Sequence, residues 1–312
     1  MRIGTGMACH TFGELVQGQV NRVPFLISLP IESYVKAAFY PDLAEELLTP
    51  PGKAKVRHII RRMLEENGLP VRGRLDIEQP LPEGKGFATS TADMLAACRA
   101  VANAYGVTLP PAYLSRLLAR LEPTDGIMYD EIVAYYHRRG RLLDRIGHLP
   151  PMKIIGIDRG GKIDTVSFNN QIITYSFEQE KEYACLLKRL KRAVKEGDAP
   201  TIGQIATRSA EMHQIHLPHP FFSELVALSE EVQGLGVVVA HSGTLAGILL
   251  DAASEAIREQ ADYIAGKMAS VKRKTYRFTV RRLAERNLTY DTTISYDEHI
   301  PFSHLAGSDN DP

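Results

Sequence analysis

Residues 81–93 read LPEGKGFATSTAD, and this stretch decides how the rest of the chain is interpreted. Two glycines, Gly84 and Gly86, precede a run of small and hydroxyl-bearing residues, and an alanine-rich apolar segment follows at once. This order predicts a tight loop that leads into the first turn of a buried helix. The N–H groups at a helix start lack partners within the helix, and the helix dipole adds partial positive charge there. The stretch therefore predicts either a phosphate site or only a capped helix after a glycine turn.

The composition narrows the classes of partner. The chain has 312 residues, which suggests about two domains, and its 44% hydrophobic and 24% charged residues are typical of a globular enzyme. Its 37 basic and 37 acidic residues balance, so charge gives no reason to expect nucleic acid or a membrane surface as a partner. Cys9, Cys98 and Cys185 form no CxxC pair and indicate free thiols. Without a signal-peptide pattern or a membrane-length apolar run, we expect a cytoplasmic protein.

Strands and helices alternate along the first half of the chain. The apolar spacing of residues 53–67 predicts a helix with Asn67 and Gly68 as its end, and residues 72–79 alternate like a strand. The remaining elements expected here are strands at 23–30 and 33–40 after a turn-rich segment at 10–18, helices at 111–121 and 129–139, and a hairpin at 153–168.

From about residue 170 the residue pattern changes, and helical segments become more frequent. The pattern predicts helices at 181–198, 220–234 and 255–268, and within 201–220 a helix that runs into a histidine-bearing loop. It also predicts a strand before the small-residue loop at 241–247 with a strand or helix after it, a strand or short helix at 274–283, a strand at 291–297 and a disordered tail at 303–312. Both halves therefore read as α+β.

Three small-residue loops recur in order along the chain, at 10–18, 84–91 and 241–247. They resemble the three motifs of the GHMP kinase superfamily, which includes galactokinase, homoserine kinase and mevalonate kinase. The second motif of that family, P-x-x-x-G-L-G-S-S-A-A, aligns with Pro82, Gly86 and the run FATSTA after it. The third, a glycine and serine turn near the C-terminus, is matched by AHSGTLAG at 240–247.

Within that superfamily the chain most resembles the L-threonine kinases of coenzyme B12 (cobalamin) synthesis and propanediol utilisation. Their G-E-L-V-Q-G is present at 13–18, their A-H-S-G-T at 240–244, and their G-K-G-x-A-S-S-T-A-D at 84–93 with Thr89 in place of the first serine. Residues 8–12 read ACHTF, where those kinases have a Cys-Pro-Gly-Thr-Cys-like run. Both departures lie beside the expected active site, so the acceptor alcohol can differ from threonine.

The resemblance implies an α+β fold with two domains and the active site between them. It implies an N-terminal nucleotide-binding domain like domain 2 of ribosomal protein S5 over residues 1–168 and a ferredoxin-like domain over 169–302, followed by the tail 303–312. It also implies ATP and Mg²⁺ as cofactors and a small-molecule acceptor. A homodimer stays open as an assembly, because the sequence does not settle the oligomeric state.

The resemblance also assigns the nucleotide site. The residues expected to hold the nucleotide are Pro82, Gly84, Lys85, Gly86, Phe87, Ala88, Thr89, Ser90 and Thr91. The backbone from Gly84 onward supplies donors to the phosphates, whereas Lys85 either adds positive charge or faces solvent. Ser90 is expected to ligate Mg²⁺, with plain N-capping as its alternative. Glu122, at the end of the next helix, is the second metal ligand, with a surface glutamate as its alternative.

Two carboxylates compete for the catalytic role. Asp125 lies three residues after Glu122 in EPTDG, where several family members carry a catalytic aspartate that takes the acceptor proton or orients the hydroxyl. Asp130 in GIMYD is the alternative, and Asp125 is preferred. The acceptor pocket is expected to use His10, Glu14, Asp93, Ser242, Gly243 and Thr244. Asp93 suits a substrate ammonium group, although a carboxylate in a first helical turn is also stabilised by the dipole alone.

The function that follows is phosphorylation of an amino-acid hydroxyl, with L-threonine as the first expectation. Serine, homoserine or another amino alcohol is the alternative within kinases. An inactive ligand sensor of the same fold is the third reading, and the retention of Ser90, Glu122 and Asp125 argues against it.

Overall fold

The computed structural model describes residues 2–161, 163, 173–270 and 274–281. Its helices are α1 (Ala54–Glu66), α2 (Thr89–Tyr105), α3 (Pro111–Ala119), α5 (Phe177–Glu196), α6 (Ala199–His213), α7 (Phe222–Glu231) and α8 (Ile257–Ser270). Its strands are β1 (Gly4–Val20), β2 (Val23–Tyr40), β3 (Leu47–Leu48), β4 (Gly73–Glu78), β5 (Ile132–Tyr136), β6 (Arg141–Gly147), β7 (Met152–Asp158), β8 (Gly236–Val239), β9 (Leu245–Asp251) and β10 (Thr275–Thr279). Across these described ranges, no helix combines the length and apolar character needed to cross a bilayer.

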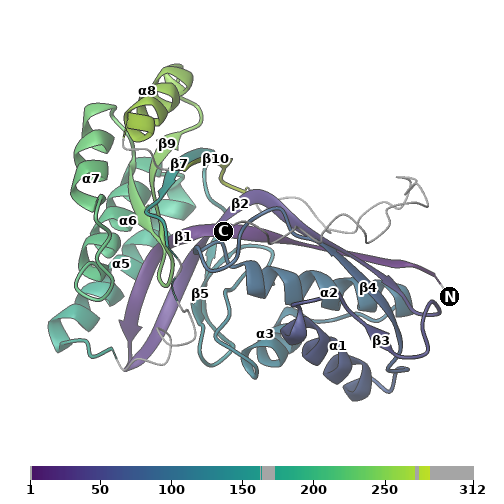
Figure 1. The fold of residues 1–312 in the computed structure, drawn as a ribbon. Coiled ribbons are helices and arrows are strands. Elements are labelled where there is room, and N and C mark those ends of the chain that lie inside the picture. The colour runs from purple at the N-terminus through teal and green to yellow at the C-terminus, as the bar shows by residue number, and fades with distance from the viewer. Residues whose placement is uncertain (1, 162, 164–172, 271–273, 282–312) are drawn as a thin grey trace, which may run out of the picture.

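One curled sheet connects the two ends of the molecule. Its strands follow the order β10-β7-β9-β8-β1-β2-β4-β3, and β5 pairs with β2 and carries β6. The long strands β1 and β2 run across the molecule, with α1, α2 and α3 gathered at one end and α5 to α8 at the other (Figure 1). This mixture of helices with a largely antiparallel sheet is the α+β architecture expected from the sequence.

Helix α2 lies unusually close to β1. A Cβ atom on Gly4 would come within 2.1 Å of the Ala100 carbonyl oxygen, and one on Gly6 within 2.2 Å of the Ala96 oxygen. The glycines on the strand and the alanines on the helix therefore let the two backbones approach, and twelve of the helix residues are buried. This confirms the predicted buried helix and packs the middle of α2, at Ala96 and Ala100, against β1.

Helix α1 forms where its apolar spacing predicts. Its buried positions are Val56, Ile59, Ile60, Met63 and Leu64, all on one face. The helix ends where Asn67 caps it, with the side-chain amide donating to the Met63 carbonyl over 2.8 Å. The strand prediction at 72–79 is confirmed by β4, and the helix prediction at 111–121 by α3.

The helix predicted at 129–139 is wrong, because the segment forms a β-hairpin. Strand β5 carries the run IVAYY, and it pairs with β6 and, through Tyr135, with Leu26 of β2. Its first four residues are all buried, which suits β-branched and aromatic side chains covered on both faces of a strand. Gly140 makes the turn with φ +60°, and a Cβ there would meet the Ser115 carbonyl oxygen at 2.5 Å.

The turn-rich segment predicted at 10–18 lies inside β1, and the expected break near Pro30 lies inside β2. Three irregularities interrupt the β1–β2 register, between Cys9 and Thr11, Thr11 and Glu14, and Glu14 and Val16. β-bulges of this kind add local twist and re-aim side chains, and they are common next to active sites. The sequence signals of a loop therefore mark a distorted stretch of strand.

The second half follows the predicted alternation. The segment at 236–251 is a strand, turn and strand (β8 and β9), and residues 275–279 form β10, which settles both of the strand-or-helix alternatives. In the predicted hairpin at 153–168 the first strand is β7, which pairs with β9 and β10, and most of the second arm lies outside the described residues. The predicted strand at 291–297 and the tail at 303–312 lie outside them too.

Candidate active site

The three small-residue segments meet at one place. The Gly13 N–H donates to the Gly86 carbonyl oxygen over 3.4 Å, and the Thr244 N–H donates to the Lys85 carbonyl over 2.8 Å. Residues from β1, from the loop before α2 and from the turn between β8 and β9 are thus joined backbone to backbone. Segments that are more than 150 residues apart in the chain form one surface.

The close approach explains why these segments need small residues. A Cβ on Gly243 would lie 2.2 Å from the Lys85 carbonyl oxygen, and one on Gly86 would lie 2.4 Å from the Ala240 Cβ. Neither distance leaves room for a side chain, because Cβ contacts below about 3 Å do not occur without movement. The glycine pattern in the sequence therefore reflects packing between the loops as well as access to the backbone.

The loop before α2 has the conformation of an anion site. Gly84, Gly86 and Ala88 have φ values of +73°, +109° and +54°, so left-handed residues alternate with others along the loop. Ala88 occupies the N-cap and offers no side-chain acceptor to the N–H groups of the first helical turn. These donors and the positive end of the α2 dipole suit a phosphate group.

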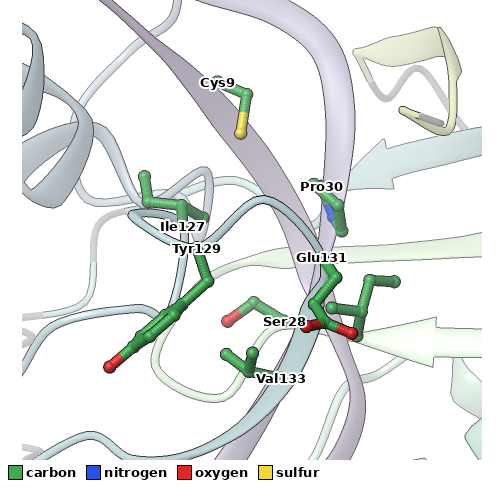
Figure 2. A pocket seen from close by; sticks show the side chains of 9 residues that line it. Cys9, Ser28, Pro30, Ile127, Tyr129, Glu131 and Val133 are labelled. Carbon is green, nitrogen blue, oxygen red and sulfur yellow. The ribbon is translucent and has the colours of Figure 1, made fainter. Parts of the chain in front are cut away.

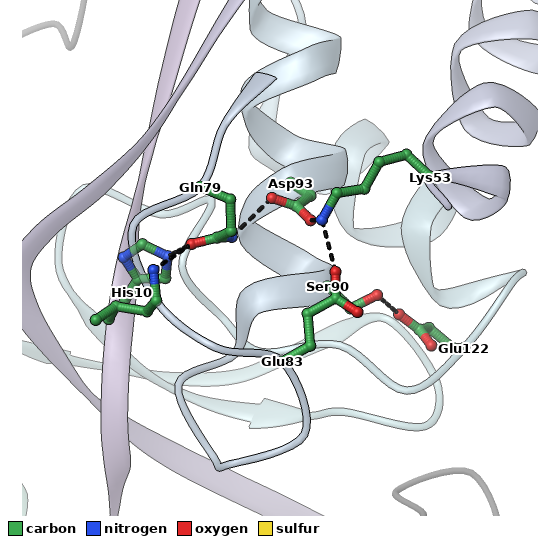
Figure 3. Close-up of polar contacts among 8 residues, drawn as sticks. His10, Lys53, Gln79, Glu83, Ser90, Asp93 and Glu122 are labelled. Carbon is green, nitrogen blue, oxygen red and sulfur yellow. Dashed lines mark hydrogen bonds and ion pairs between the residues drawn. The ribbon is translucent and has the colours of Figure 1, made fainter. Parts of the chain in front are cut away.

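Ser90 and Glu122, the two expected metal ligands, are in contact. The Ser90 hydroxyl donates a hydrogen bond to Glu122 Oε1 (Figure 3). Lys55 from α1 forms an ion pair with Glu122 Oε2. Ser90 does not cap its helix, because Ala88 is the N-cap residue and the serine side chain points to Glu122. A hydroxyl and a carboxylate oxygen converge here, and oxygen donors of this kind fit Mg²⁺.

Ser90 and Glu122 would need a bound nucleotide to complete the coordination of a Mg²⁺ ion. Among the side chains that the structure describes, no group of three or more His, Cys, Asp or Glu is arranged to hold a metal ion. A Mg²⁺ ion commonly takes one or two protein oxygens and completes its shell with water and phosphate oxygens. Ser90 and Glu122 therefore suit an ion that arrives with phosphates better than an all-protein metal centre.

Asp125 is held against the first turn of α2. One carboxylate oxygen accepts from the Ser28 hydroxyl over 2.7 Å, and the other faces the Thr91 hydroxyl at 3.5 Å. Burial raises the pKa of the Asp125 carboxyl and the charge of Glu122 adds to the rise, although the two hydrogen bonds oppose it. Asp130, the alternative, is exposed. The geometry therefore brings Asp125 to the first turn of α2, which favours it over the exposed Asp130.

Glu14 lies near Asp125 on the distorted part of β1. Its side chain is buried, and one carboxylate oxygen accepts from the His241 backbone N–H over 2.5 Å. Burial raises the pKa of Glu14 well above its ordinary value, and the charge of Asp125 raises it further. Two buried carboxylates that repel each other favour a state in which one of them holds a proton.

His10 and Asp93 belong to one hydrogen-bonded chain. His10 Nε2 donates to Gln79 Oε1 over 2.7 Å, and Gln79 Nε2 donates to one Asp93 oxygen over 2.8 Å. The other Asp93 oxygen accepts from Lys53 Nζ over 2.6 Å (Figure 3). Burial lowers the pKa of His10, so the neutral ring is favoured. The sequence predicted a substrate ammonium as the partner of Asp93, whereas the ammonium that the structure places there is that of Lys53.

Two of the expected nucleotide residues have other partners. The Phe87 ring is buried edge-on against Tyr276, with ring centroids 5.1 Å apart, and only its backbone can face a ligand. The Lys85 ammonium pairs with Asp158 over 2.7 Å and donates to the Gly161 carbonyl over 2.6 Å. Its charge is therefore directed at the end of β7.

A small pocket opens beside Asp125. Cys9, Ser28 and Val133 are among the side chains that line it, between β1, β2 and the start of β5 (Figure 2). Since the Ser28 hydroxyl also donates to Asp125, the pocket adjoins the candidate catalytic carboxylate.

The sequence did not indicate Ser28, Gln79 or Lys55 as site residues. Ser28 is the one hydroxyl in the apolar run VPFLISLP, and that isolated polar position was the available signal. Gln79 and Lys55 carry no comparable signal, because their roles depend on partners that are distant in the chain.

Comparisons with known proteins identify relatives of this chain. A family model described as the N-terminal domain of GHMP kinases matches residues 54–137, the region from α1 to the end of β5. An L-threonine kinase of Citrobacter freundii is 31% identical over 81% of this chain and 86% of its own length. An L-threonine kinase of Salmonella typhimurium is 27% identical over 83% of this chain and 86% of its own length.

Solved structures show the same fold at low identity. A homoserine kinase from Cytophaga hutchinsonii superposes with a TM-score of 0.68 at 14% identity, covering 90% of this chain and 95% of its own. A Streptococcus pneumoniae phosphomevalonate kinase in complex with phosphomevalonate and AMPPNP gives a TM-score of 0.67 at 13% identity, covering 90% of this chain and all of its own. A chain with this fold, these meeting loops and a relative of such identity and coverage belongs to the GHMP kinase family, whose members are ATP-dependent phosphotransferases.

Proposed function

We propose that this kinase uses ATP and Mg²⁺ to phosphorylate the side-chain hydroxyl of L-threonine, giving O-phospho-L-threonine. The observation that carries the proposal is the fastening of Glu122 to Ser90 and of Asp125 to Thr91, at one helix start beside an anion-binding loop. The two relatives named as L-threonine kinases support threonine as the acceptor.

Different residues of the site serve different steps of phosphoryl transfer. The loop backbone from Gly84 to Ala88 binds and orients the phosphates, and Ser90 with Glu122 would hold the metal ion. Mg²⁺ bound there would neutralise charge on the transferring phosphoryl group. Water must be kept away from this group, and the buried surroundings of Asp125 and Glu14 serve that purpose.

Asp125 is the group that we assign to the acceptor proton. A bond forms between the acceptor oxygen and the γ-phosphorus, and the bond from that phosphorus to the β–γ bridging oxygen breaks, which releases ADP. The acceptor proton passes to the Asp125 carboxylate, and Ser28 and Thr91 hold that carboxylate in place. Its raised pKa makes it a better proton acceptor than an exposed aspartate.

Glu14, His10, Asp93 and the turn at 242–244 stay our candidates for holding the acceptor. For Asp93 to bind the ammonium of an amino acid, that ammonium must share or replace the contact with Lys53. The pocket beside Ser28 offers apolar walls for a side-chain methyl group.

Acceptor-dependent ADP release tests the proposal. The purified protein is assayed with ATP and Mg²⁺ against L-threonine, L-serine, L-homoserine, D-threonine and small polyols, and the product is identified by ³¹P NMR. We expect the highest kcat/KM with L-threonine, and a kcat about 10²- to 10⁴-fold lower for Asp125→Asn. Absence of ADP release with every amino acid would overturn the acceptor class.

A second acceptor has one specific observation in its favour. The segment 8–12 differs from its counterpart in the L-threonine kinases, and it carries Cys9, which lines the pocket beside Ser28, and His10, which bonds to Gln79. If L-serine or L-homoserine gives the higher kcat/KM, this altered segment is the place where the specificity has changed.

A further inference from the structure

Two lysines at the start of α1 reach across to the active site. Lys53, the N-cap residue, pairs with Glu83 of the loop before α2 and with Asp93 of α2, each over 2.6 Å. Two residues later, Lys55 pairs with Glu122. The start of α1 is therefore tied to the loop that suits phosphates through Lys53 (Figure 3). It is also tied, through Lys55, to the carboxylate that suits the metal ion.

Lys55 differs from the other lysines of the site in its freedom to move. Its side chain is 45% exposed, whereas those of Lys53 and Lys85 are 17% and 18% exposed. Lys53 contacts two carboxylates, and Lys85 contacts Asp158 and a backbone carbonyl. Among the described residues the Lys55 ammonium contacts a single carboxylate, that of Glu122, so it can change partner with the smallest loss of contacts.

The contact of Lys55 is one that a metal ion would disturb. Glu122 gives one oxygen to the Ser90 hydroxyl and the other to Lys55. A divalent cation on Ser90 and Glu122 would repel the ammonium a few ångströms away. The phosphates that accompany such an ion carry excess negative charge, and they would attract it. Lysine serves as a mobile point charge for phosphate because its ammonium sits on a flexible four-carbon stem.

We propose that Lys55 is a nucleotide-binding residue of this kinase, whose ammonium neutralises Glu122 in the free enzyme and contacts the terminal phosphates of bound nucleotide. This inference rests on the proposed metal role of Ser90 and Glu122. It assigns to α1 a direct part in binding the triphosphate, whereas the motifs of the sequence place phosphate binding only in the loop before α2.

Nucleotide affinity measured without turnover tests the inference. Titration calorimetry at fixed Mg²⁺ compares AMP, ADP and a non-hydrolysable ATP analogue on the wild type, Lys55→Met and Lys55→Arg. We expect Lys55→Met to bind the ATP analogue about 10- to 100-fold more weakly, the size of a lost charged hydrogen bond, with AMP affinity unchanged. Lys55→Arg, which keeps the charge, should recover most of the affinity.

The control is Lys191→Met on α5. Lys191 is also half exposed, at 51%, and also pairs with a carboxylate, that of Asp144, so it matches Lys55 in all but position. We expect its nucleotide affinities to equal those of the wild type. An equal loss for all three nucleotides in Lys55→Met, or no loss, would overturn the role of Lys55. Failure of the wild type to bind the ATP analogue would instead contradict the proposed function itself.

Discussion

The hydroxyl of Ser90 and the carboxylate of Glu122, 32 residues apart in the chain, are hydrogen-bonded to each other. A second contact lies beside the first, because the Asp125 N–H donates to the Thr91 hydroxyl over 3.3 Å. The segment after α3 is thus fastened to the first turn of α2 at two adjacent residues. This arrangement places both proposed functional carboxylates with respect to the same helix start.

The metal role of Ser90 predicts a difference between two substitutions at that position. Ser90→Ala removes the hydroxyl, and we expect kcat to fall by about 100-fold, as when about 2.7 kcal/mol of transition-state stabilisation is lost. The Mg²⁺ concentration at half-maximal rate should also rise. Ser90→Thr keeps a hydroxyl and should retain most of the activity. Equal rates for Ser90→Ala and the wild type across a Mg²⁺ titration would remove the metal role.

The proton-acceptor role distinguishes Asp125 from Asp130. Asp125→Asn should lower kcat by about 10²- to 10⁴-fold, the contribution typical of a general base, and leave the KM for ATP little changed. Asp130→Asn is the matched control, because its side chain is exposed and the charge change is the same. We expect its kcat to stay within about threefold of the wild type. Steady-state kinetics with thermal melts of both variants decides, and a larger loss in Asp130→Asn would reverse the assignment.

The packing of the three loops predicts a steric cost at Gly243. A Cβ there would meet the Lys85 carbonyl oxygen at 2.2 Å, so Gly243→Ala should lower the free energy of unfolding by about 1–3 kcal/mol. It should also raise the KM for ATP, because the loop before α2 must shift. Gly266→Ala in α8 is the control, since nothing lies within 4 Å of its added Cβ. Urea denaturation of both variants measures the difference. Equal free energies of unfolding would contradict the close packing of Gly243 against Lys85.

Because Glu14 is buried, we expect its replacement by neutral glutamine to stabilise the protein more at high pH than at low pH. Its pKa is raised in the folded protein above the ordinary 4.5, so its favourable contribution is fully present below about pH 4.5 and is lost as the pH rises through the folded pKa. Glu14→Gln carries no charge to bury. Its free energy of unfolding, relative to the wild type, should therefore rise from pH 5 to pH 8.

Urea denaturation at the two pH values checks this prediction. Glu65→Gln, at an exposed position on α1, serves as the control, and its difference from the wild type should be the same at both pH values. If the difference for Glu14→Gln is equally independent of pH, Glu14 is not held in the environment that the structure shows.

Local sequence rules were sufficient where an element depends on its own residues. The apolar spacing of α1 defined its buried face, and the small residues before α2 defined a loop followed by a helix. They were insufficient at 129–139, where the hydrophobic pattern allowed a helix. There the pairing of β5 with β2 and β6 decided for a strand. At 10–18, loop-like residues form bulges because β1 must pair with β2 and also meet β8 at Val239.

The sequence by itself determined the α+β class and the family resemblance, because both follow from residue types at fixed spacings. The candidates Ser90, Glu122 and Asp125 are what that resemblance implies. Only the tertiary structure decided that the three small-residue segments meet, that Lys85 forms an ion pair with Asp158 and that Lys55 forms one with Glu122. These contacts join residues whose separation in the chain says nothing of their distance in space. The meeting of the loops depends on which backbones can approach, and Gly86 and Gly243 permit that approach.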